Sequence, residues 1–178
     1  MRRMQGRTPD PARPEGFLRV SAALAAKQHA HAPLWLEVAA RTSQEAADAL
    51  GVSLGQIAKS VVFRRKTDEQ AVLVIASGDR RVDEAKLKAL TGPLGRADAD
   101  YVKARTGFSI GGVSPLGFAP VEGAAAPLLF VDQELFRFDV IWAAAGHPNG
   151  VFKMTPAELA ALTDAPVIDV VLPVQDAS

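Results

Sequence analysis

"QIAKSVVFRR", residues 56–65, combines β-branched, aromatic and apolar side chains in the pattern of a β-strand. A second run, "AVLVIAS" at 71–77, follows after the polar segment "KTDEQ". Two such runs joined by a short polar segment predict an antiparallel hairpin. This hairpin is the starting point for the fold.

One lysine stands near the start of the first run. The period of two in a strand places Lys59, Val61 and Phe63 on one face, so the charge lies beside two large apolar residues. An ammonium group there either meets an anionic or carbonyl partner, as functional lysines do, or snorkels to water along its aliphatic stem. The spacing leaves both interpretations open because it does not show how deep the strand end lies.

The rest of the chain mixes helical and strand patterns in irregular order. Helices are expected at 14–32, 42–51, 82–92, 98–107 and 155–163, from apolar spacing, capping residues and terminal glycines. Further strands are expected at 33–38, 108–118 with an interruption, 127–132, 138–146, 151–154 and 166–172. This order lacks a strict βαβα alternation, so we predict an α/β fold with a curved, mixed, largely antiparallel and barrel-like sheet flanked by helices.

Length and composition indicate one domain. The chain has 178 residues, of which 48% are hydrophobic, enough to bury a core. Residues 1–15 are rich in proline and arginine and are predicted to be a disordered tail, followed by a domain at 16–173. No secretory h-region and no apolar run of about 18 residues is present, so we expect a soluble cytoplasmic protein without membrane contact.

Charge and cysteine content exclude several classes of function. The 20 basic residues balance the 20 acidic ones, so the chain has no global positive field for non-specific binding of nucleic acid. Basic clusters at 64–66, at 80–81 and at 86–88 are either solvated faces or one phosphate-contacting patch. The chain has no cysteine, which excludes disulfides, thiolate zinc sites and cysteine nucleophiles.

A glycine-rich segment, "TGFSIGGVSPLGF" at 106–118, is the second unusual feature. Glycines inside a strand mark either a bulge where a ligand approaches the backbone or a turn that requires positive φ. The segment has the spacing of neither the P-loop nor the dinucleotide fingerprint, so it does not predict a nucleotide phosphate site.

The histidines give weaker signals. His147 lies in "AGHPNG", where Asn149-Gly150 predicts a hairpin turn, and it is a general base, a substrate hydrogen-bonder or a bystander. His29 and His31 lie at a predicted helix end without nearby acids or cysteine, so we expect no metal site there.

In this order, three segments resemble the YbaK and prolyl-tRNA-editing (ProX-type) family of aminoacyl-tRNA deacylases. They are "GVSLGQIAKSVVF", "TGFSIGGVSPLGF" with the family's G-x-x-x-P loop at Gly111 to Pro115, and "WAAAGHPNGVFKMTPAEL". The resemblance runs from about Phe17 to Leu172 and implies an α/β domain with a curved mixed sheet.

The resemblance implies hydrolysis of the ester between a wrong amino acid and the terminal ribose of a tRNA, without a metal or other cofactor. Lys59 would hold the terminal nucleotide and the carbonyl region, and the backbone of the glycine loop would orient the aminoacyl group. The ribose hydroxyl of the tRNA would help to activate water, so no protein nucleophile is required. The expected catalytic set is Lys59, Gly111, Gly112 and Ser114, and the expected substrate-binding set is Ser60, Val113, Pro115, His147, Leu34, Leu36 and Val61.

Two functions follow as hypotheses. The first is a trans-editing deacylase that acts on tRNA mischarged with Ala, Ser, Thr or Cys, with an aminoacyl-tRNA synthetase as a further partner. The second is a non-catalytic module of the same fold that binds tRNA ends or a synthetase. Ser60 stands where relatives carry threonine or asparagine, and the motifs combine features of two branches of the family, which leaves the edited amino acid open.

Overall fold

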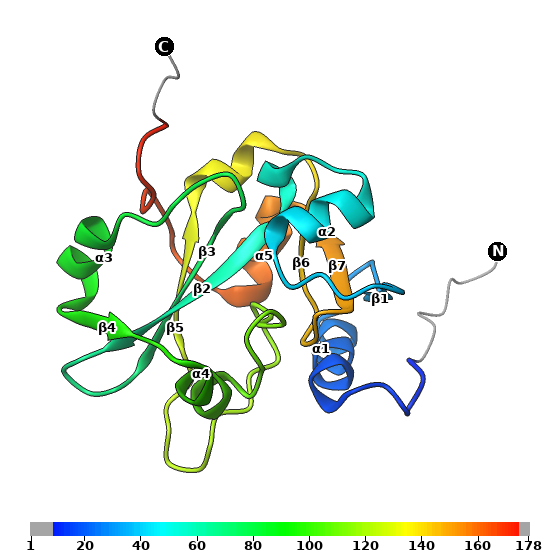
Figure 1. The fold of residues 1–178 in the computed structure, drawn as a ribbon, viewed down its shortest axis with the longest axis horizontal. Helices are drawn as coiled ribbons and strands as arrows, with labels where there is room; N and C mark the ends of the chain where they lie inside the picture. The colour runs from blue at the N-terminus through cyan, green and yellow to red at the C-terminus, as the bar shows by residue number, and fades with distance from the viewer. Residues whose placement is uncertain (1–8, 175–178) are drawn as a thin grey trace.

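The computed structural model describes residues 9–174, which form five α-helices, two 3₁₀ helices and eight strands (Figure 1). The helices are α1 (Glu15–Ala26), α2 (Ser43–Leu50), α3 (Glu84–Thr91), α4 (Ala99–Thr106) and α5 (Pro156–Thr163), with η1 (Leu54–Gln56) and η2 (Gln133–Arg137). The strands are β1 (Leu34–Trp35), β2 (Ala58–Arg65), β3 (Ala71–Ser77), β4 (Leu94–Arg96), β5 (Leu128–Asp132), β6 (Ile141–Ala144), β7 (Gly150–Met154) and β8 (Val167–Ile168).

The predicted hairpin lies at the centre of a five-stranded sheet. Strands β2 and β3 pair antiparallel from Ala58 opposite Ser77 to Arg64 opposite Ala71, which confirms the prediction. The sheet has the order β4-β2-β3-β5-β8, with β5 parallel to β3 and β8 parallel to β5. All residues of β3 are buried because this strand has a neighbour on each side and side-chain clusters on both faces.

A second sheet of three strands lies beside the first. Its order is β1-β7-β6, with both pairings antiparallel. A parallel bridge between Ile57 and Trp142 connects the two sheets. Four of the six strand pairings are antiparallel, so the mixed, largely antiparallel α/β architecture is confirmed. Both sheets are open, and the barrel-like detail of the prediction is not confirmed.

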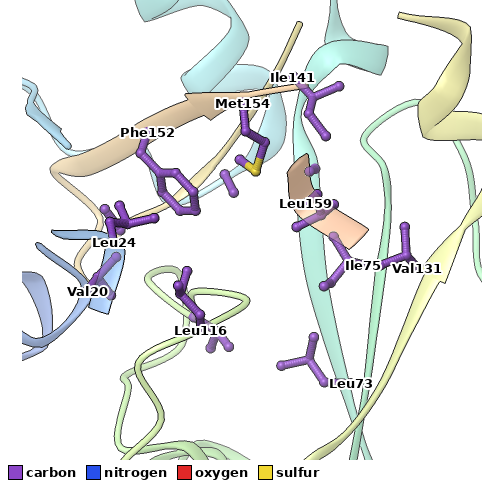
Figure 2. Packing of buried hydrophobic residues seen from close by; sticks show 14 of the residues in the cluster. Val20, Leu24, Leu73, Ile75, Leu116, Val131, Ile141, Phe152, Met154 and Leu159 are labelled. Atoms are coloured by element: carbon purple, nitrogen blue, oxygen red, sulfur yellow. The ribbon is translucent and has the colours of Figure 1, made fainter. Parts of the chain in front are cut away.

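The main hydrophobic core joins the two sheets. Figure 2 shows side chains from α1, β3, β5, β6, β7 and α5 meeting there, together with Leu116 from the loop before β5. Full burial of a side chain such as Leu24 or Phe152 contributes about 1.5–3 kcal/mol. A smaller cluster on the other face of the five-stranded sheet packs Val72, Val74 and Leu87 of α3 together.

Capping residues define the starts of α2 and α5 as expected, whereas α1 ends at Ala26 and not at the predicted residue 32, because Gln28 turns into the left-handed region with φ 57°. The Thr155 hydroxyl accepts a hydrogen bond from the Glu158 amide, and the Glu158 carboxylate accepts one from the Thr155 amide, a complete capping box before α5. At α2 the Thr42 hydroxyl accepts from the Glu45 amide, while the Glu45 carboxylate accepts from the Thr42 hydroxyl instead of its amide. Gly51 ends α2 in the left-handed region, with φ 68°.

The structure differs from the predictions in several segments. Residues 108–118 form a loop instead of an interrupted strand, because Gly111 and Gly117 have φ of 89° and 80° and Pro115 lacks an amide hydrogen. Strand β4 lies at the sheet edge and was not expected, and β1 and β8 are only 2 residues long each.

Residues 1–8 of the predicted tail at 1–15 lie outside the described residues, which begin at residue 9. Of its described part, Glu15 begins α1 and the Arg13 guanidinium lies 4.3 Å from the centre of the Trp35 ring. Between residues 9 and 174 no helix has the length and apolar character needed to cross a bilayer.

Candidate active site

A cavity of about 190 Å³ opens where the two sheets meet. It lies between the first residues of β2, the strand β6 and the N-terminal end of α2. Its lining residues are Ala40, Arg41, Thr42, Ser43, Ala46, Ile57, Ala58, Lys59, Ser60, Gly111, Val113, Trp142, Ala143, Ala144, Gly150 and Val151.

Lys59 and Ser60 bring β2 to this cavity. The register places Lys59 opposite Ala76 and Ser60 opposite Ile75, so the two side chains belong to opposite faces of the sheet. Both residues nevertheless line the cavity. The cavity therefore lies across the first residues of β2 and not against one face of the strand.

Both side chains are poised for a polar ligand. Burial lowers the pKa of Lys59 below its ordinary value, while the Asp79 carboxylate opposes this shift and Arg81 adds to it. The Ser60 hydroxyl oxygen is buried and has no hydrogen-bond partner among the described residues. The cavity lining therefore includes one residue with a half-buried ammonium and one with an unpaired buried hydroxyl, the two kinds of group that a carbonyl or anionic ligand can satisfy.

The glycine loop supplies another part of the lining, through Gly111 and Val113. Gly111 has φ 89°, which side chains with a Cβ rarely adopt. At Gly112, an added Cβ would lie 2.8 Å from the Cα and 2.9 Å from the backbone N and C of His147. A side chain would therefore be strained at Gly111 and would clash at Gly112. The backbone of the loop is left facing the cavity at Gly111.

Ser114 and Pro115 lie behind this loop. Both are buried, and the Ser114 hydroxyl accepts a hydrogen bond of 3.3 Å from the Leu116 amide. Neither residue lines the cavity. The Ser114 hydrogen bond holds the backbone that follows Val113.

His147 lies on the flank of the glycine loop and not in the cavity lining. Its ring stacks on Trp35 with centroids 5.0 Å apart, and its Nδ1 accepts a hydrogen bond from the Asn149 amide. Burial, with a smaller contribution from Arg41, lowers the pKa of His147. The hairpin predicted around it is confirmed by the antiparallel pairing of β6 and β7, although the left-handed residue of the turn is Gly146, with φ 83°.

The three apolar candidates lie elsewhere. Leu34 is 50% exposed on the short strand β1, and Leu36 packs with Ala40 and Ala47 in a small cluster beside α2. Val61 lies further along β2, opposite Val74. The structure does not bring these side chains to the cavity.

Residues that were not expected line the cavity instead. Arg41 and Ser43 approach from the start of α2, while Trp142 and Ala144 approach from β6. Thr42 was noticed only as a helix cap and Trp142 only as part of a strand, and neither pattern indicates a cavity. The adjacency of Arg41 and Gly111, whose added Cβ would lie 3.7 Å from the Arg41 Cα, depends on tertiary packing.

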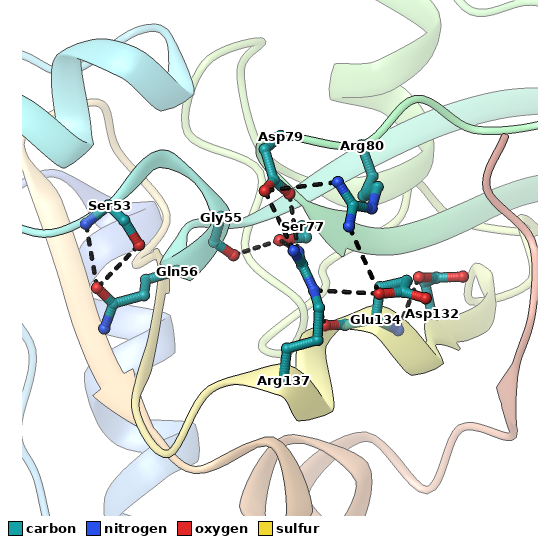
Figure 3. A network of polar contacts seen from close by, with 9 residues as sticks. All are labelled: Ser53, Gly55, Gln56, Ser77, Asp79, Arg80, Asp132, Glu134 and Arg137. Atoms are coloured by element: carbon teal, nitrogen blue, oxygen red, sulfur yellow. Dashed lines mark hydrogen bonds and ion pairs between the residues drawn. The ribbon is translucent and has the colours of Figure 1, made fainter. Parts of the chain in front are cut away.

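A polar network lies outside the cavity lining, and its Asp79 carboxylate is close enough to Lys59 to affect the lysine pKa. Figure 3 shows Arg137 bound to both Asp79 carboxylate oxygens, at 2.8 and 3.3 Å, and to the Ser77 hydroxyl at 2.8 Å. The Ser77 hydroxyl in turn donates to the carbonyl of Gly55 in η1. The network therefore ties the end of β3 to the segment that leads into β2.

His29 and two arginines of the basic cluster at 64–66 have structural partners. His29 contacts the Lys153 carbonyl through Nε2 at 2.8 Å and lies 3.6 Å from Glu158, so it connects the end of α1 to β7 and α5. In the basic cluster at 64–66, Arg64 pairs with Glu69 at 2.8 Å and Arg65 with Asp68 at 2.6 Å. These pairs reduce the positive charge that the hairpin can offer to phosphates.

Comparison with known families agrees with this geometry. The sequence model of the aminoacyl-tRNA editing domain matches residues 37–162. That range contains every cavity-lining residue, from Ala40 to Val151.

Curated proteins and solved structures include similar chains. The uncharacterized protein YwhH of Bacillus subtilis (strain 168) is 37% identical over 124 residues, 69% of this chain and 75% of that protein. The proline–tRNA ligase of Pelotomaculum thermopropionicum is 36% identical over 89 residues, which are 49% of this chain and 15% of the synthetase. A crystal structure of a candidate trans-editing enzyme for prolyl tRNA synthetase has a TM-score of 0.80 at 36% identity, covering 91% of this chain and 100% of that one. The hypothetical protein APE2540 has a TM-score of 0.78 at 30% identity, covering 86% and 99%.

Proposed function

Because the chain belongs to the aminoacyl-tRNA editing domain family, we propose that it is a trans-editing deacylase for tRNA mischarged with a small amino acid. One observation carries this proposal. Lys59 and the glycine loop, which are separated by about fifty residues in the sequence, line the same cavity.

The size and lining of the cavity support a small aminoacyl group such as Ala, Ser, Thr or Cys. Its volume is about 190 Å³, and Ala40, Ala46, Ala143 and Ala144 are among its lining residues. Each additional methylene in such a pocket changes binding by only about 1–3 kcal/mol, so selection among these amino acids depends on small differences in shape.

In the proposed reaction, water adds to the ester carbonyl carbon, and the bond from that carbon to the ribose oxygen breaks. The free amino acid leaves with the oxygen of the water, and the ribose oxygen takes up a proton released by that water and becomes a hydroxyl group. The Lys59 ammonium and the backbone amides of the glycine loop stabilise the negative charge that develops on the carbonyl oxygen. Positioning of a reactive ester and its water supplies the rest, with the tRNA ribose hydroxyl activating the water and no metal required.

The proposed partner is the 3′ aminoacyl end of a tRNA. Arg41 lies at the cavity edge, at the start of α2, where it can contact a backbone phosphate. The formal net charge of zero predicts weak binding to the rest of the tRNA, so a synthetase that delivers the substrate is included in the proposal.

The test is deacylation of labelled Ala-, Ser-, Thr-, Cys- and Pro-tRNA by the pure protein, with and without a chelator. We expect hydrolysis of one or more of the small-residue esters, at the same rate in both conditions. Loss of activity with the chelator would contradict metal independence. Folded protein that hydrolyses none of the five but binds tRNA ends would establish the non-catalytic module instead.

A further inference from the structure

A column of three side chains flanks the glycine loop outside the cavity. The Trp35 ring stacks on His147 with centroids 5.0 Å apart and an interplanar angle of 25°. The Arg13 guanidinium lies 4.3 Å from the Trp35 ring centre, and Phe17 meets the same ring edge-on at 5.2 Å. Trp35 is thus held by contacts from the start of α1 and by His147.

Backbone contacts tie the same regions together. An added Cβ on Gly16 would lie 2.4 Å from the Gly146 carbonyl oxygen, so α1 and the β6–β7 turn approach as closely as two glycines allow. Trp35 pairs with Gly150 in the three-stranded sheet. The Asn149 side-chain amide also donates to the Leu36 carbonyl at 2.8 Å. The turn at 146–150 is therefore held from α1 and from β1.

The turn at 146–150 also contacts the wall of the cavity. The backbone of His147 lies against Gly112, where no Cβ fits, and the neighbours Gly111 and Val113 line the cavity. Gly150, at the other end of the turn, lines the cavity as well. A shift of the turn would displace two parts of the lining together.

We propose that Trp35 is a positioning residue for the His147 turn, held in place by Arg13, and that through His147 it sets the wall formed by Gly111 to Val113. This role rests on the proposed function, because the wall matters for editing only if the cavity is the deacylase site. Trp35 and Arg13 lie outside residues 37–162, the range that the family model matches.

The orientation of the His147 ring follows from the same contacts. Its Nδ1 accepts a hydrogen bond from the Asn149 amide at 3.1 Å, so the neutral ring carries its proton on Nε2. Trp35 covers one face of the ring and contributes to the burial that lowers the pKa of His147. Loss of the indole would free the ring and expose it to water.

The kinetic test is a double-mutant cycle between Trp35→Leu and His147→Ala, measured as kcat/KM for deacylation. We expect Trp35→Leu to lower kcat/KM about tenfold in the wild-type background and less than twofold in the His147→Ala background, because residues that act as a unit are not additive. Trp35→Phe keeps an aromatic face and is expected to restore most of the activity. Equal losses from Trp35→Leu in both backgrounds would overturn the proposal.

The second test does not depend on deacylase activity. NMR titration of the His147 ring should give a higher midpoint in Trp35→Leu than in the wild type or Trp35→Phe, and faster amide hydrogen exchange at Gly112. An unchanged His147 midpoint and unchanged exchange would refute the positioning role even if the protein is inactive. Conversely, if the wild-type protein is inactive but Trp35→Leu still raises the His147 midpoint and speeds exchange at Gly112, the proposed function alone would be refuted.

Two further variants separate positioning from stability. Arg13→Ala leaves the indole in place, so it is expected to shift both readouts in the same direction but less, and it serves if Trp35→Leu does not fold. Leu87→Ala removes a buried side chain from the cluster beneath α3, on the far face of the five-stranded sheet. It should lower stability while leaving the His147 midpoint unchanged.

Discussion

Gly112→Ala is the substitution whose effect follows most directly from the geometry. The added Cβ would lie 2.8 Å from the His147 Cα, whereas ordinary van der Waals contact begins at 3.4 Å. The difference, 3.4 − 2.8, requires the loop or the turn to move by about 0.6 Å. Both clashing partners are backbone, so neither can rotate away as a side chain would.

Two consequences of this displacement can be measured. Overpacking of this kind costs about 1–3 kcal/mol, which corresponds to a fall in Tm of about 2–4 °C per kcal/mol in a chain of this size. Because Gly111 and Val113 line the cavity, we also expect kcat/KM for deacylation to fall about tenfold or more, since a misplacement of about 1 Å can cost about 100-fold.

Gly123→Ala is the matched control. Gly123 has φ 83° and nothing within 4 Å of an added Cβ, so this variant tests backbone strain alone in the loop before β5. It should lower Tm slightly and leave kcat/KM unchanged. The measurements are thermal unfolding and steady-state deacylation of both variants. A Gly112→Ala protein with the Tm and the kcat/KM of the wild type would refute the assigned contact between the glycine loop and the turn at 146–150.

Two other perturbations test the supporting structure. Asp132 is fully buried, and its two carboxylate oxygens accept hydrogen bonds of 2.9 Å each from the amides of Glu134 and Val170. Asp132→Asn replaces one acceptor by a donor and should lower the free energy of unfolding by about 1–3 kcal/mol in urea titrations. The control is Asp169→Asn, which breaks an exposed pair with Lys86 and should lower the free energy of unfolding by less than about 1 kcal/mol. Equal effects of the two variants would contradict the structural role of Asp132. The Asp79 carboxylate raises the pKa of Lys59 against the effect of burial, so Asp79→Asn should lower that pKa further and move the alkaline limb of the deacylation pH profile to lower pH. An unshifted limb would show either that Asp79 does not act on Lys59 or that the charge of Lys59 does not limit the reaction.

The sequence predicts the parts of this structure that depend on local chemistry. The hairpin of β2 and β3 follows from two β-branched runs, and the ends of α2 and α5 follow from Thr42, Gly51 and the Thr155 capping box. The placement of Lys59 and Gly111 in one site came from the family resemblance, since nothing local connects two residues so far apart in the chain.

Other features depend on packing that no local pattern shows. Residues 108–118 resemble a strand in composition, yet the backbone of Gly111 and Gly117 turns the chain away from a sheet. Leu34 and Leu36 were in the expected substrate-binding set, but the residue of β1 that packs on His147 is Trp35. The cavity itself lies between two sheets, so Arg41 and Trp142 reach it only after both sheets have formed.

Replacement of Lys59 is the most direct test of the central claim. Lys59→Ala and Lys59→Met remove the ammonium group, and Lys88→Ala removes an exposed lysine from α3 as a matched control. The proposed deacylase should lose at least about 100-fold in kcat/KM in both Lys59 variants, a contribution typical of one group that stabilises the developing oxyanion, with Tm retained. If folded Lys59→Ala hydrolyses small-residue tRNA esters with the kcat/KM of the wild type, the account is contradicted.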